Sequence, residues 1–293
     1  MEFRTPVAPL KGLQGTLTHN KPVVLIGSCF TDNIGSRLVQ RGFDAAVNPC
    51  GTLYNPASIA STLLDILYRR PYTPDDVFEH QGRWHSFSHH SRFSADTQQE
   101  CLDKINAATA LAAEKLETAS ALIITFGTAW VFRHKETNRI MANCHKLHPD
   151  TFSREQLNAT QIHGLWKKMV RELLARNPQM KIIFTVSPIR HLADGAHGNQ
   201  LSKATLLLAV NRLAADFPDN VVYFPAYEIM MDDLRDYRFY AADMTHPSET
   251  AVDYIYSLFA ESVMSPDTIR LADDNLRVYK RNAHIEGGLK NTF

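Results

Sequence analysis

The sequence has no excess of charge of either sign, because its 293 residues carry 31 Lys and Arg against 31 Asp and Glu. This balance argues against nucleic acid and against an anionic membrane surface as partners, since both attract strongly basic proteins. The chain also has no run of about 18 uncharged apolar residues, and its N-terminus has no apolar segment of signal-peptide length. We therefore expect a cytoplasmic protein that binds neither nucleic acid nor membranes.

Cysteine is scarce, and the usual signatures of metal and cofactor sites are missing. The four cysteines are too few and too widely spaced for a disulfide scaffold, and no CxxC pair indicates zinc. His85, His89 and His90 lie close together, but their surroundings are not clearly helical, so a metal site is not favoured. Neither GxGxxG nor a P-loop motif occurs, which argues against bound nucleotides. We expect reduced thiols, no metal and no cofactor.

Short apolar runs rich in Val and Ile alternate with amphipathic stretches of helical length. The runs lie at residues 23–26, 45–48, 121–126, 181–186 and 221–224. The amphipathic stretches cover residues 31–41, 56–68, 97–119, 161–176, 201–217 and about 246–263. Buried strands that alternate with helices are typical of a parallel sheet covered by helices on both faces. The pattern predicts an α/β fold with a doubly wound parallel sheet, in a single domain over residues 1–293.

Three segments depart from this alternation. Residues 71–94 are rich in His and aromatic side chains without a strong period, and we expect an excursion over the edge of the sheet. Residues 130–143 contain a Thr-Asn turn and predict an inserted β-hairpin. Residues 282–293 contain a Gly-Gly pair and are expected to form a frayed or loosely docked tail.

Residues suited to acyl transfer follow the predicted strands. Ligands of a doubly wound sheet bind outside the carboxyl ends of its strands, so these loops are expected to meet on one surface. Ser28 and Cys29 follow the first strand, where a helix N-terminus would stabilise a thiolate or an oxyanion. Asp243 lies three residues before His246, a spacing that lets the carboxylate accept the Nδ1 proton and leaves Nε2 as a general base.

Six segments of the sequence resemble the GSCFA domain family: LIGSCFTDNIG, NPCGTLYNP, TFGTAWVF, ANCHK, VSPIRH and DMTHPSE. This family is similar to the SGNH, or GDSL-type, hydrolases. The resemblance covers a core at about residues 3–263, which leaves a C-terminal tail at 264–293. It implies a three-layer α/β/α sandwich of the flavodoxin-like type, with the nucleophile after the first strand and an Asp-x-x-His pair near the C-terminus.

The resemblance also implies roles for single residues. In the Gly-Asp-Ser motif of the SGNH hydrolases the third residue is the nucleophile, and alignment on the glycine puts Cys29 there, with Ser28 as the alternative. Gly51 matches the glycine whose N–H stabilises the oxyanion. Asp243 and His246 match the final motif.

The third motif departs from the hydrolase pattern. Where the hydrolases carry Gly-x-Asn-Asp, residues 127–130 read Gly-Thr-Ala-Trp, without the asparagine donor. We expect Gly127 and Thr128 to line the oxyanion site. Arg190 and His191, after the fourth strand, are candidates for binding a carboxylate or phosphate group, which a guanidinium binds through two hydrogen bonds.

Cys144 and His145 combine a thiol with an adjacent imidazole. Neighbouring residues on a strand point to opposite faces, so the two side chains need not touch. We do not favour them as an independent active site and keep them as candidates for lining the same pocket.

These observations predict a hydrolase or acyltransferase that acts on an ester or thioester of a small molecule through a Cys or Ser nucleophile, His and Asp. The alternative is a non-catalytic protein on a degenerate hydrolase scaffold, which binds a small polar ligand through Arg190, His191 and residues 84–90. The missing asparagine favours the alternative. The sequence leaves the acyl group and the oligomeric state open.

Overall fold

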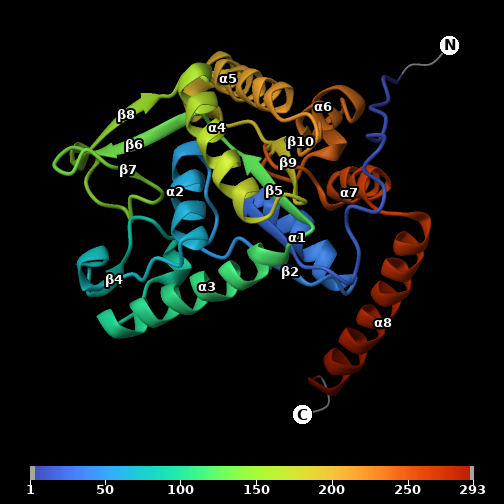
Figure 1. Cartoon of the computed structure of the whole chain (residues 1–293), viewed down its shortest axis with the longest axis horizontal. Coiled ribbons are helices and arrows are strands. Elements are labelled where there is room, and N and C mark those ends of the chain that lie inside the picture. Colours follow the sequence, from blue (N-terminus) through green and yellow to red (C-terminus); the bar gives the residue numbers. More distant parts are fainter. Residues whose placement is uncertain (1–3, 291–293) are drawn as a thin grey trace.

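A parallel five-stranded sheet forms the centre of the protein (Figure 1). The computed structural model describes residues 4–290. The strands of the sheet are β1 (Val23–Gly27), β2 (Ala45–Val47), β5 (Ala121–Phe126), β9 (Lys181–Val186) and β10 (Val221–Tyr223). They lie in the order β2-β1-β5-β9-β10, each parallel to its neighbours. Numbered along the chain this order is 2-1-3-4-5, which is that of flavodoxin-like doubly wound folds.

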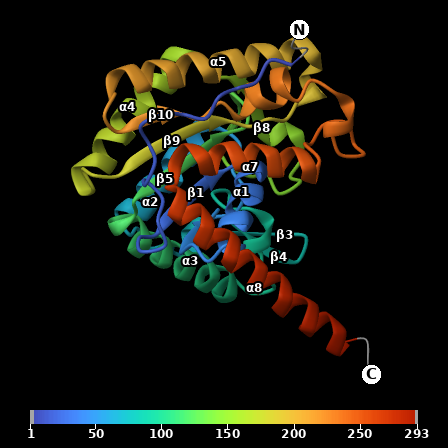
Figure 2. The ribbon, with the colours of Figure 1, turned by 90° about the vertical axis from the view of Figure 1, so that its right-hand side faces the viewer.

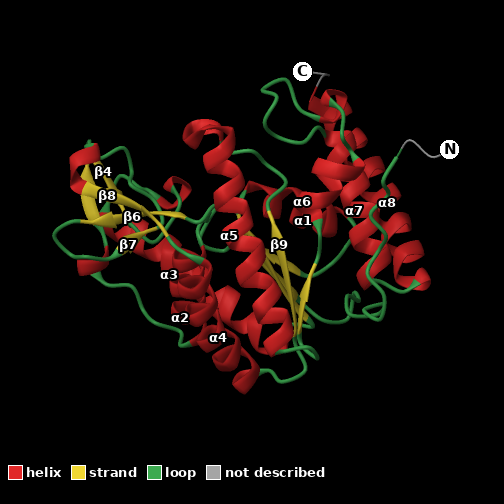
Figure 3. Cartoon of the chain, turned by 90° about the horizontal axis from the view of Figure 1, so that it is seen from above, coloured by secondary structure: helices red, strands yellow, loops and turns green. Residues whose placement is uncertain are grey.

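Helices cover both faces of this sheet, so the protein has the three layers implied by its sequence (Figure 3). One face is covered by α1 (Cys29–Gln40), α6 (Ala226–Glu228) and α7 (Glu249–Val263). The other is covered by α2 (Pro56–Leu67), α3 (Gln98–Thr118), α4 (Ala159–Arg176) and α5 (Gly195–Asp216). Leu25 packs into the first layer and Ile26 into the second. Because successive residues of a strand point to opposite faces, the strands need apolar side chains at every position.

The predicted strands are confirmed, and most helix ends lie close to their predicted positions. The last helix begins later than predicted, at Glu249 instead of at about residue 246. Ser248 is its N-cap, and its Oγ accepts the N–H of Ala251 at 3.3 Å. The first helix also begins earlier than predicted, which makes Cys29 its first residue.

Residues 71–94 contain an antiparallel β-hairpin that the sequence analysis missed. Its strands are β3 (Phe78–His80) and β4 (Arg83–His85). Strands of three residues are too short to show a period of two. The turn between them, Gln81 and Gly82, has φ values of +52° and +74°, as a tight type I′ hairpin turn requires.

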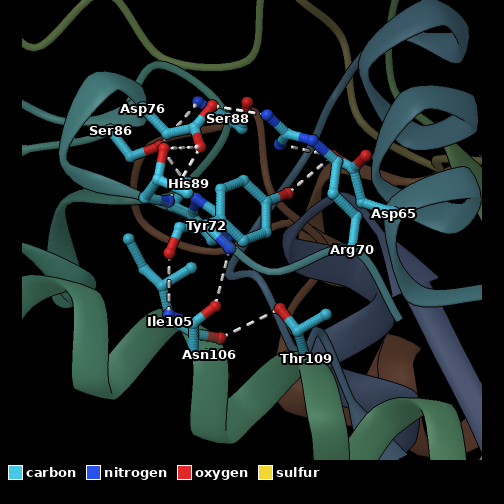
Figure 4. A network of polar contacts seen from close by, with 11 residues as sticks. Asp65, Arg70, Tyr72, Asp76, Ser86, Ser88, His89, Ile105, Asn106 and Thr109 are labelled. Carbon is cyan, nitrogen blue, oxygen red and sulfur yellow. Dashed lines mark hydrogen bonds and ion pairs between the residues drawn. The ribbon is translucent and has the colours of Figure 1, made fainter. Parts of the chain in front are cut away.

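Buried polar contacts fix this segment to α2 and α3 (Figure 4). The hydroxyl of Tyr72 donates to Asp65 of α2 at 2.7 Å, and its backbone N–H donates to Asn106 of α3 at 2.8 Å. Nδ1 of His89 lies 3.0 Å from Oγ of Ser86. The excursion therefore has a defined position against the helices.

The inserted hairpin is confirmed and belongs to a larger antiparallel sheet. Its strands are β6 (Trp130–His134) and β7 (Ile140–Met141), and β8 (Phe152–Gln156) pairs with the other edge of β6. The three strands lie beside α2 at one end of the protein (Figure 1).

The C-terminal segment forms α8 (Pro266–Lys290), which projects from the rest of the protein (Figures 1 and 2). The expected frayed tail at residues 282–293 is therefore helical as far as Lys290, while residues 291–293 lie outside the described part of the chain. Among residues 4–290, no helix combines the length and the apolar character that crossing a membrane requires.

Candidate active site

The two predicted nucleophiles lie at the junction of β1 and α1, but they differ in exposure. Gly27 allows the chain to approach β5 closely, because a Cβ there would lie 2.3 Å from the carbonyl oxygen of Thr125. Ser28 is fully buried, and its Oγ has no hydrogen-bond partner among the described residues. Cys29 is partly exposed and carries a free thiol. Of the two side chains, only that of Cys29 is open to a substrate.

The surroundings of Cys29 raise the pKa of its thiol on balance, although they include groups of opposing effect. Burial raises the pKa of the thiol, and the charge of Asp32 raises it further. The backbone N–H groups of Phe30 and of Cys29 itself face the sulfur and lower its pKa, as does the charge of Lys203. The start of α1 thus offers hydrogen-bond donors to a negative charge on this residue.

A carboxylate that the sequence analysis did not single out lies one helical turn after Cys29. Asp32 accepts hydrogen bonds from Nδ2 of Asn48 at 2.8 Å and from Oγ1 of Thr52 at 3.1 Å. Oδ1 of Asn48 in turn accepts the N–H of Gly27 at 2.8 Å. This network ties the loop after β2 to the start of α1. Its sequence signal is an acidic residue in the first turn of a helix, a position that the helix dipole favours.

The N–H of Gly51 is engaged within the protein. It donates to the carbonyl oxygen of Asn48 at 2.7 Å. Gly51 has a φ of +84°, and a Cβ there would lie only 2.1 Å from Cβ of His90. Arg92 also donates to the carbonyl of Asn48. The excursion therefore packs directly on the loop that carries Gly51.

The N–H groups of Gly127 and Thr128 are engaged as well. Both donate to the carbonyl oxygen of Tyr54, at 2.8 Å and 3.1 Å. Oγ1 of Thr128 lies 3.1 Å from Oγ of Ser202 and accepts the N–H of Trp130 at 3.1 Å. The loop after β5 is thus held by α5 on one side and by the residues before α2 on the other.

Asp243 and His246 form a closed turn before α7. Nδ1 of His246 lies 2.6 Å from Oδ2 of Asp243, and Oδ1 accepts the backbone N–H groups of Thr245 and His246, each at 2.9 Å. Met244 closes the turn with a φ of +56°. These hydrogen bonds lower the pKa of Asp243 to about 2. The carboxylate is therefore ionised, and because its contact occupies Nδ1 of His246, Nε2 is left for other partners.

His191 connects the loop after β9 with the other parts of the site. Burial, followed by the charges of Lys203 and His246, lowers the pKa of His191 to about 4. Its ring meets that of Tyr54 edge-on, with centroids 6.2 Å apart, and the charge of Cys29 acts on Tyr54. Three residues predicted from the sequence therefore lie at the same end of the sheet: Cys29, His191 and His246.

Arg190 precedes His191 in this loop. Its side chain is partly exposed and forms no ion pair within residues 4–290. Its charge acts on Tyr227, whose pKa burial raises. Arg190 is thus a partly exposed cation next to His191 in sequence.

Lys203 of α5 is a further site residue that the sequence analysis missed. It is 1% exposed, and its Nζ donates to the carbonyl oxygens of Gly127 at 2.7 Å and Ser187 at 2.9 Å. Its sequence position does carry a signal, because Lys203 lies in helical phase with the buried Leu206 and Val210. A lysine on the apolar face of a helix is unusual unless its charge has partners.

The GSCFA family profile matches residues 22–259, a span that holds every site residue described above. The chain belongs to the GSCFA family. The resemblance drawn from its motifs is thereby confirmed.

Several solved structures resemble this GSCFA protein at low overall similarity. A carbohydrate esterase family 2 enzyme from Myceliophthora fergusii has 13% identity and a TM-score of 0.45, over 88% of this chain and 68% of that one. A putative acylhydrolase from Bacteroides fragilis has 12% identity and a TM-score of 0.39, over 86% and 90%. An acetyl xylan esterase from Butyrivibrio proteoclasticus has 11% identity and a TM-score of 0.42, over 84% and 64%. No curated protein sequence matches the chain. The fold assignment rests on the strand order itself.

In this GSCFA protein, His145 contacts the excursion. Nε2 of His145 lies 2.8 Å from the carbonyl oxygen of Ser86, and its ring centroid lies 4.6 Å from that of His85. Burial raises the pKa of Cys144 to about 11. His145 therefore belongs to the packing between the excursion and the segment after β7.

A cavity of 520 Å³ lies between α2, the excursion and the inserted strands. Phe87 and Ser88 of the excursion, Ser61 of α2, and Arg133 and Arg139 line it, whereas the nucleophile and the Asp-x-x-His turn do not. In the part of the chain that the structure describes, no group of three or more His, Cys, Asp or Glu side chains has the geometry to hold a metal ion.

Proposed function

We propose that this GSCFA protein is an acyl hydrolase or acyltransferase that acts on an ester or thioester. The nucleophile is Cys29, the general base is His246, and Asp243 holds the imidazole in the tautomer that leaves Nε2 free. Ser28 is the less favoured nucleophile because its side chain is fully buried.

The proposed reaction has two steps. The Cys29 sulfur attacks the carbonyl carbon while its proton passes to Nε2 of His246, and the leaving alcohol or thiol then takes that proton. Water or an acceptor alcohol next attacks the acyl-enzyme and gives its proton to Nε2 of His246. That proton passes to the sulfur as the C–S bond breaks, which restores the thiol of Cys29 and the neutral imidazole. The backbone N–H groups of Cys29 and Phe30 are donors for the oxyanion, because the first turn of a helix has no internal acceptors for them.

The single observation that carries the proposal is the position of Cys29. Its thiol is partly exposed, and two backbone N–H groups face its sulfur. The residue lies where β1 ends and α1 begins, in a sheet with the 2-1-3-4-5 strand order. The first turn of a helix has no internal acceptors for these N–H groups, so they can stabilise a negative charge on the sulfur or on an oxyanion.

A panel of acyl esters and thioesters tests the proposal, together with a fluorophosphonate probe and iodoacetamide. We expect turnover of at least one substrate by the unchanged protein and its loss in Cys29→Ala. Cys101→Ala is the matched control, because Cys101 is a fully buried packing residue of α3. Turnover that persists in Cys29→Ala would reject Cys29 as the nucleophile.

A second candidate function is binding of a small polar ligand without catalysis. Two observations favour it: the N–H groups of Gly51, Gly127 and Thr128 already donate to protein carbonyls, and the 520 Å³ cavity lies away from Cys29. Phe87 and Ser88 of the excursion line that cavity, whereas Arg190 and His191, which the alternative also names, do not. Two results together would support this function instead. No substrate of the panel would be turned over, and the protein would bind a ligand more weakly in the Arg139→Ala variant.

A further inference from the structure

Asn48 lies fully buried directly after β2, with a left-handed backbone conformation. Its φ of +44° is one that asparagine adopts more readily than most residues. Its backbone N–H donates to the carbonyl oxygen of Leu25 at 2.8 Å, which adds a last bond to the ladder between β2 and β1. Because the chain turns away at this point, the side chain of Asn48, and not a backbone group of β2, reaches the end of β1.

The amide of Asn48 contacts both sides of the turn that carries Cys29. Its Oδ1 accepts the N–H of Gly27 at 2.8 Å, and its Nδ2 donates to Oδ1 of Asp32 at 2.8 Å. Gly27 lies two residues before Cys29, and Asp32 lies three residues after it. One contact needs an acceptor and the other needs a donor, and an amide provides both on one short side chain. A carboxylate at position 48 would instead face the carboxylate of Asp32.

Other backbone groups of this turn are held by the neighbouring loop and strand. The carbonyl oxygen of Gly27 accepts the N–H of Leu53 at 2.8 Å, and the N–H of Ser28 donates to the carbonyl of Thr125 at 3.2 Å. The first N–H groups of α1 follow directly, and a helix has no internal acceptors for them. Their direction, and that of the Cys29 side chain, therefore depends on how the residues on either side are held.

The loop after β2 and the excursion hold Asn48 itself. Its carbonyl oxygen accepts the N–H of Gly51 at 2.7 Å and a hydrogen bond from the guanidinium of Arg92. Asp32 accepts a further hydrogen bond from Oγ1 of Thr52 at 3.1 Å. Every polar atom of Asn48 therefore has a partner. A buried polar network in which each member is satisfied favours a single arrangement of its residues.

We propose that Asn48 is a positioning residue for the nucleophile. Its amide holds Gly27 and Asp32 so that the Cys29 side chain and the first N–H groups of α1 keep the orientation that acylation requires. A displacement of a reacting group by about 1 Å can lower a rate by about 10²-fold. This inference rests on the proposed function of Cys29, but the hold on the turn can be measured without a substrate.

Two variants of Asn48 separate the loss of hydrogen bonds from the addition of a charge. Asn48→Gly tolerates the φ of +44°, adds no charge and removes both side-chain bonds. Asn48→Asp keeps an acceptor for Gly27 and places a second carboxylate against Asp32. With p-nitrophenyl acetate as the probe, we expect the saturating rate constant of Cys29 acylation to fall by about 10–100-fold in both variants. The half-saturating concentration should change little. Acylation of Asn48→Gly at the rate of the unchanged protein would overturn the proposal.

An exchange of the two side chains tests whether their contact carries the effect. When Asn48→Asp is combined with Asp32→Asn, the carboxylate accepts the N–H of Gly27 and the amide donates to the carboxylate, so both hydrogen bonds are kept. We expect the acylation rate to return close to that of the unchanged protein, and Asp32→Asn alone measures the effect of removing the charge. The double variant also covers the case in which the single variants fail to fold. A folded double variant that remains slow would contradict the inference.

Asn220→Asp is the matched control for a lost amide. Nδ2 of Asn220 donates to the carbonyl oxygens of Pro178 and Met180, directly before β10 and therefore at the opposite edge of the sheet. The variant should lower the melting temperature and leave the acylation rate of Cys29 unchanged. A fall in that rate as large as in Asn48→Gly would assign the effect to stability alone and overturn the proposal.

Amide hydrogen exchange in peptides that cover residues 23–32 measures the hold on the turn without a substrate. Exchange should be faster in Asn48→Gly than in the unchanged protein and should return to its original rate in the double variant. Equal exchange in Asn48→Gly and in the unchanged protein would show that the amide of Asn48 does not hold the turn.

The two proposals fail in different ways. If Cys29 is acylated equally fast in Asn48→Gly and in the unchanged protein, the role of Asn48 is wrong and the proposed reaction stands. If exchange becomes faster in Asn48→Gly but no substrate acylates Cys29 in the unchanged protein, the hold on the turn is right and the proposed reaction is wrong.

Discussion

Nδ1 of His246 lies 2.6 Å from the carboxylate of Asp243, in a turn that the same carboxylate closes through two backbone N–H groups. The imidazole therefore has a fixed orientation before any substrate binds. About half of each side chain is exposed, so neither contributes to the core. An arrangement of this kind constrains a histidine without stabilising the rest of the fold.

We predict that His246→Ala lowers kcat/KM by about 10²–10⁴-fold on any substrate that the unchanged protein turns over, because general-base assistance is lost. Asp243→Asn should lower it by a smaller factor. The melting temperature should change little in either variant, since both side chains are at the surface. Exposed His148→Ala is the matched control for turnover. Equal activity of His246→Ala and the unchanged protein would remove His246 from the mechanism.

We also predict that the four thiols differ in reactivity. Cys29 should react fastest with iodoacetamide, because it is partly exposed and receives two backbone N–H groups. Cys144 should follow, since burial raises its pKa to about 11. Cys50 and Cys101 should react slowest, as both side chains are buried. Peptide mass spectrometry over about pH 6–9 measures this order of reactivity. The prediction is wrong if Cys29 reacts more slowly than Cys101.

Gly51→Ala should destabilise the protein strongly. The substitution places a Cβ 2.1 Å from Cβ of His90 at a φ of +84°. Backbone strain of about 1 kcal/mol and overpacking of about 1–3 kcal/mol together predict a loss of roughly 2–4 kcal/mol in the free energy of unfolding. Gly12→Ala is the matched control, because Gly12 has a φ of +82° with nothing within 4 Å, and it should lose only about 1 kcal/mol. Urea unfolding measures the free energy of unfolding of both variants. Similar losses in the two would show that His90 moves away and relieves the contact.

Acid should destabilise the fold through His89. This side chain is 1% exposed, and burial lowers its pKa to about 3 from an ordinary value of 6.5. The stability that depends on its neutral form is therefore present above pH 6.5 and is lost as the pH falls toward 3. Between pH 6.5 and pH 5 this loss is about 2 kcal/mol.

Urea unfolding at these two pH values tests that assignment. His89→Gln should lose about 2 kcal/mol less than the unchanged protein over this interval. Exposed His148→Gln should behave like the unchanged protein. A pH dependence that is the same in all three proteins would assign the acid sensitivity to other groups.

Much of the fold was readable from the sequence because it depends on local patterns. Runs of Val and Ile mark β1, β5 and β9, and alternating helices imply the parallel sheet. The β3–β4 hairpin escaped notice because its strands are too short for a period, and only the Gln81-Gly82 turn marks it.

The residue types of the candidate site could be predicted from the sequence, but their hydrogen bonds could not. The contact of Asp243 with His246 depends on a three-residue spacing, which a sequence displays directly. Whether the N–H of Gly51 is free depends on the left-handed conformation of Asn48, with a φ of +44°, and on contacts with a distant segment. Lys203 is 76 residues from Gly127 in sequence, and only the folded structure shows that its Nζ donates to the carbonyl of Gly127.

Identifying the residue that carries the acyl group distinguishes Cys29 from every other candidate nucleophile. Brief incubation with an activated acyl ester or thioester, followed by acid quenching and peptide mass spectrometry, traps a covalent intermediate where it forms. The proposed reaction predicts one added acyl group on Cys29, accumulation of that species in Asp243→Asn, and no adduct in Cys29→Ala. An acyl group on Ser28 or on Cys144, or turnover without any adduct on Cys29, would contradict it.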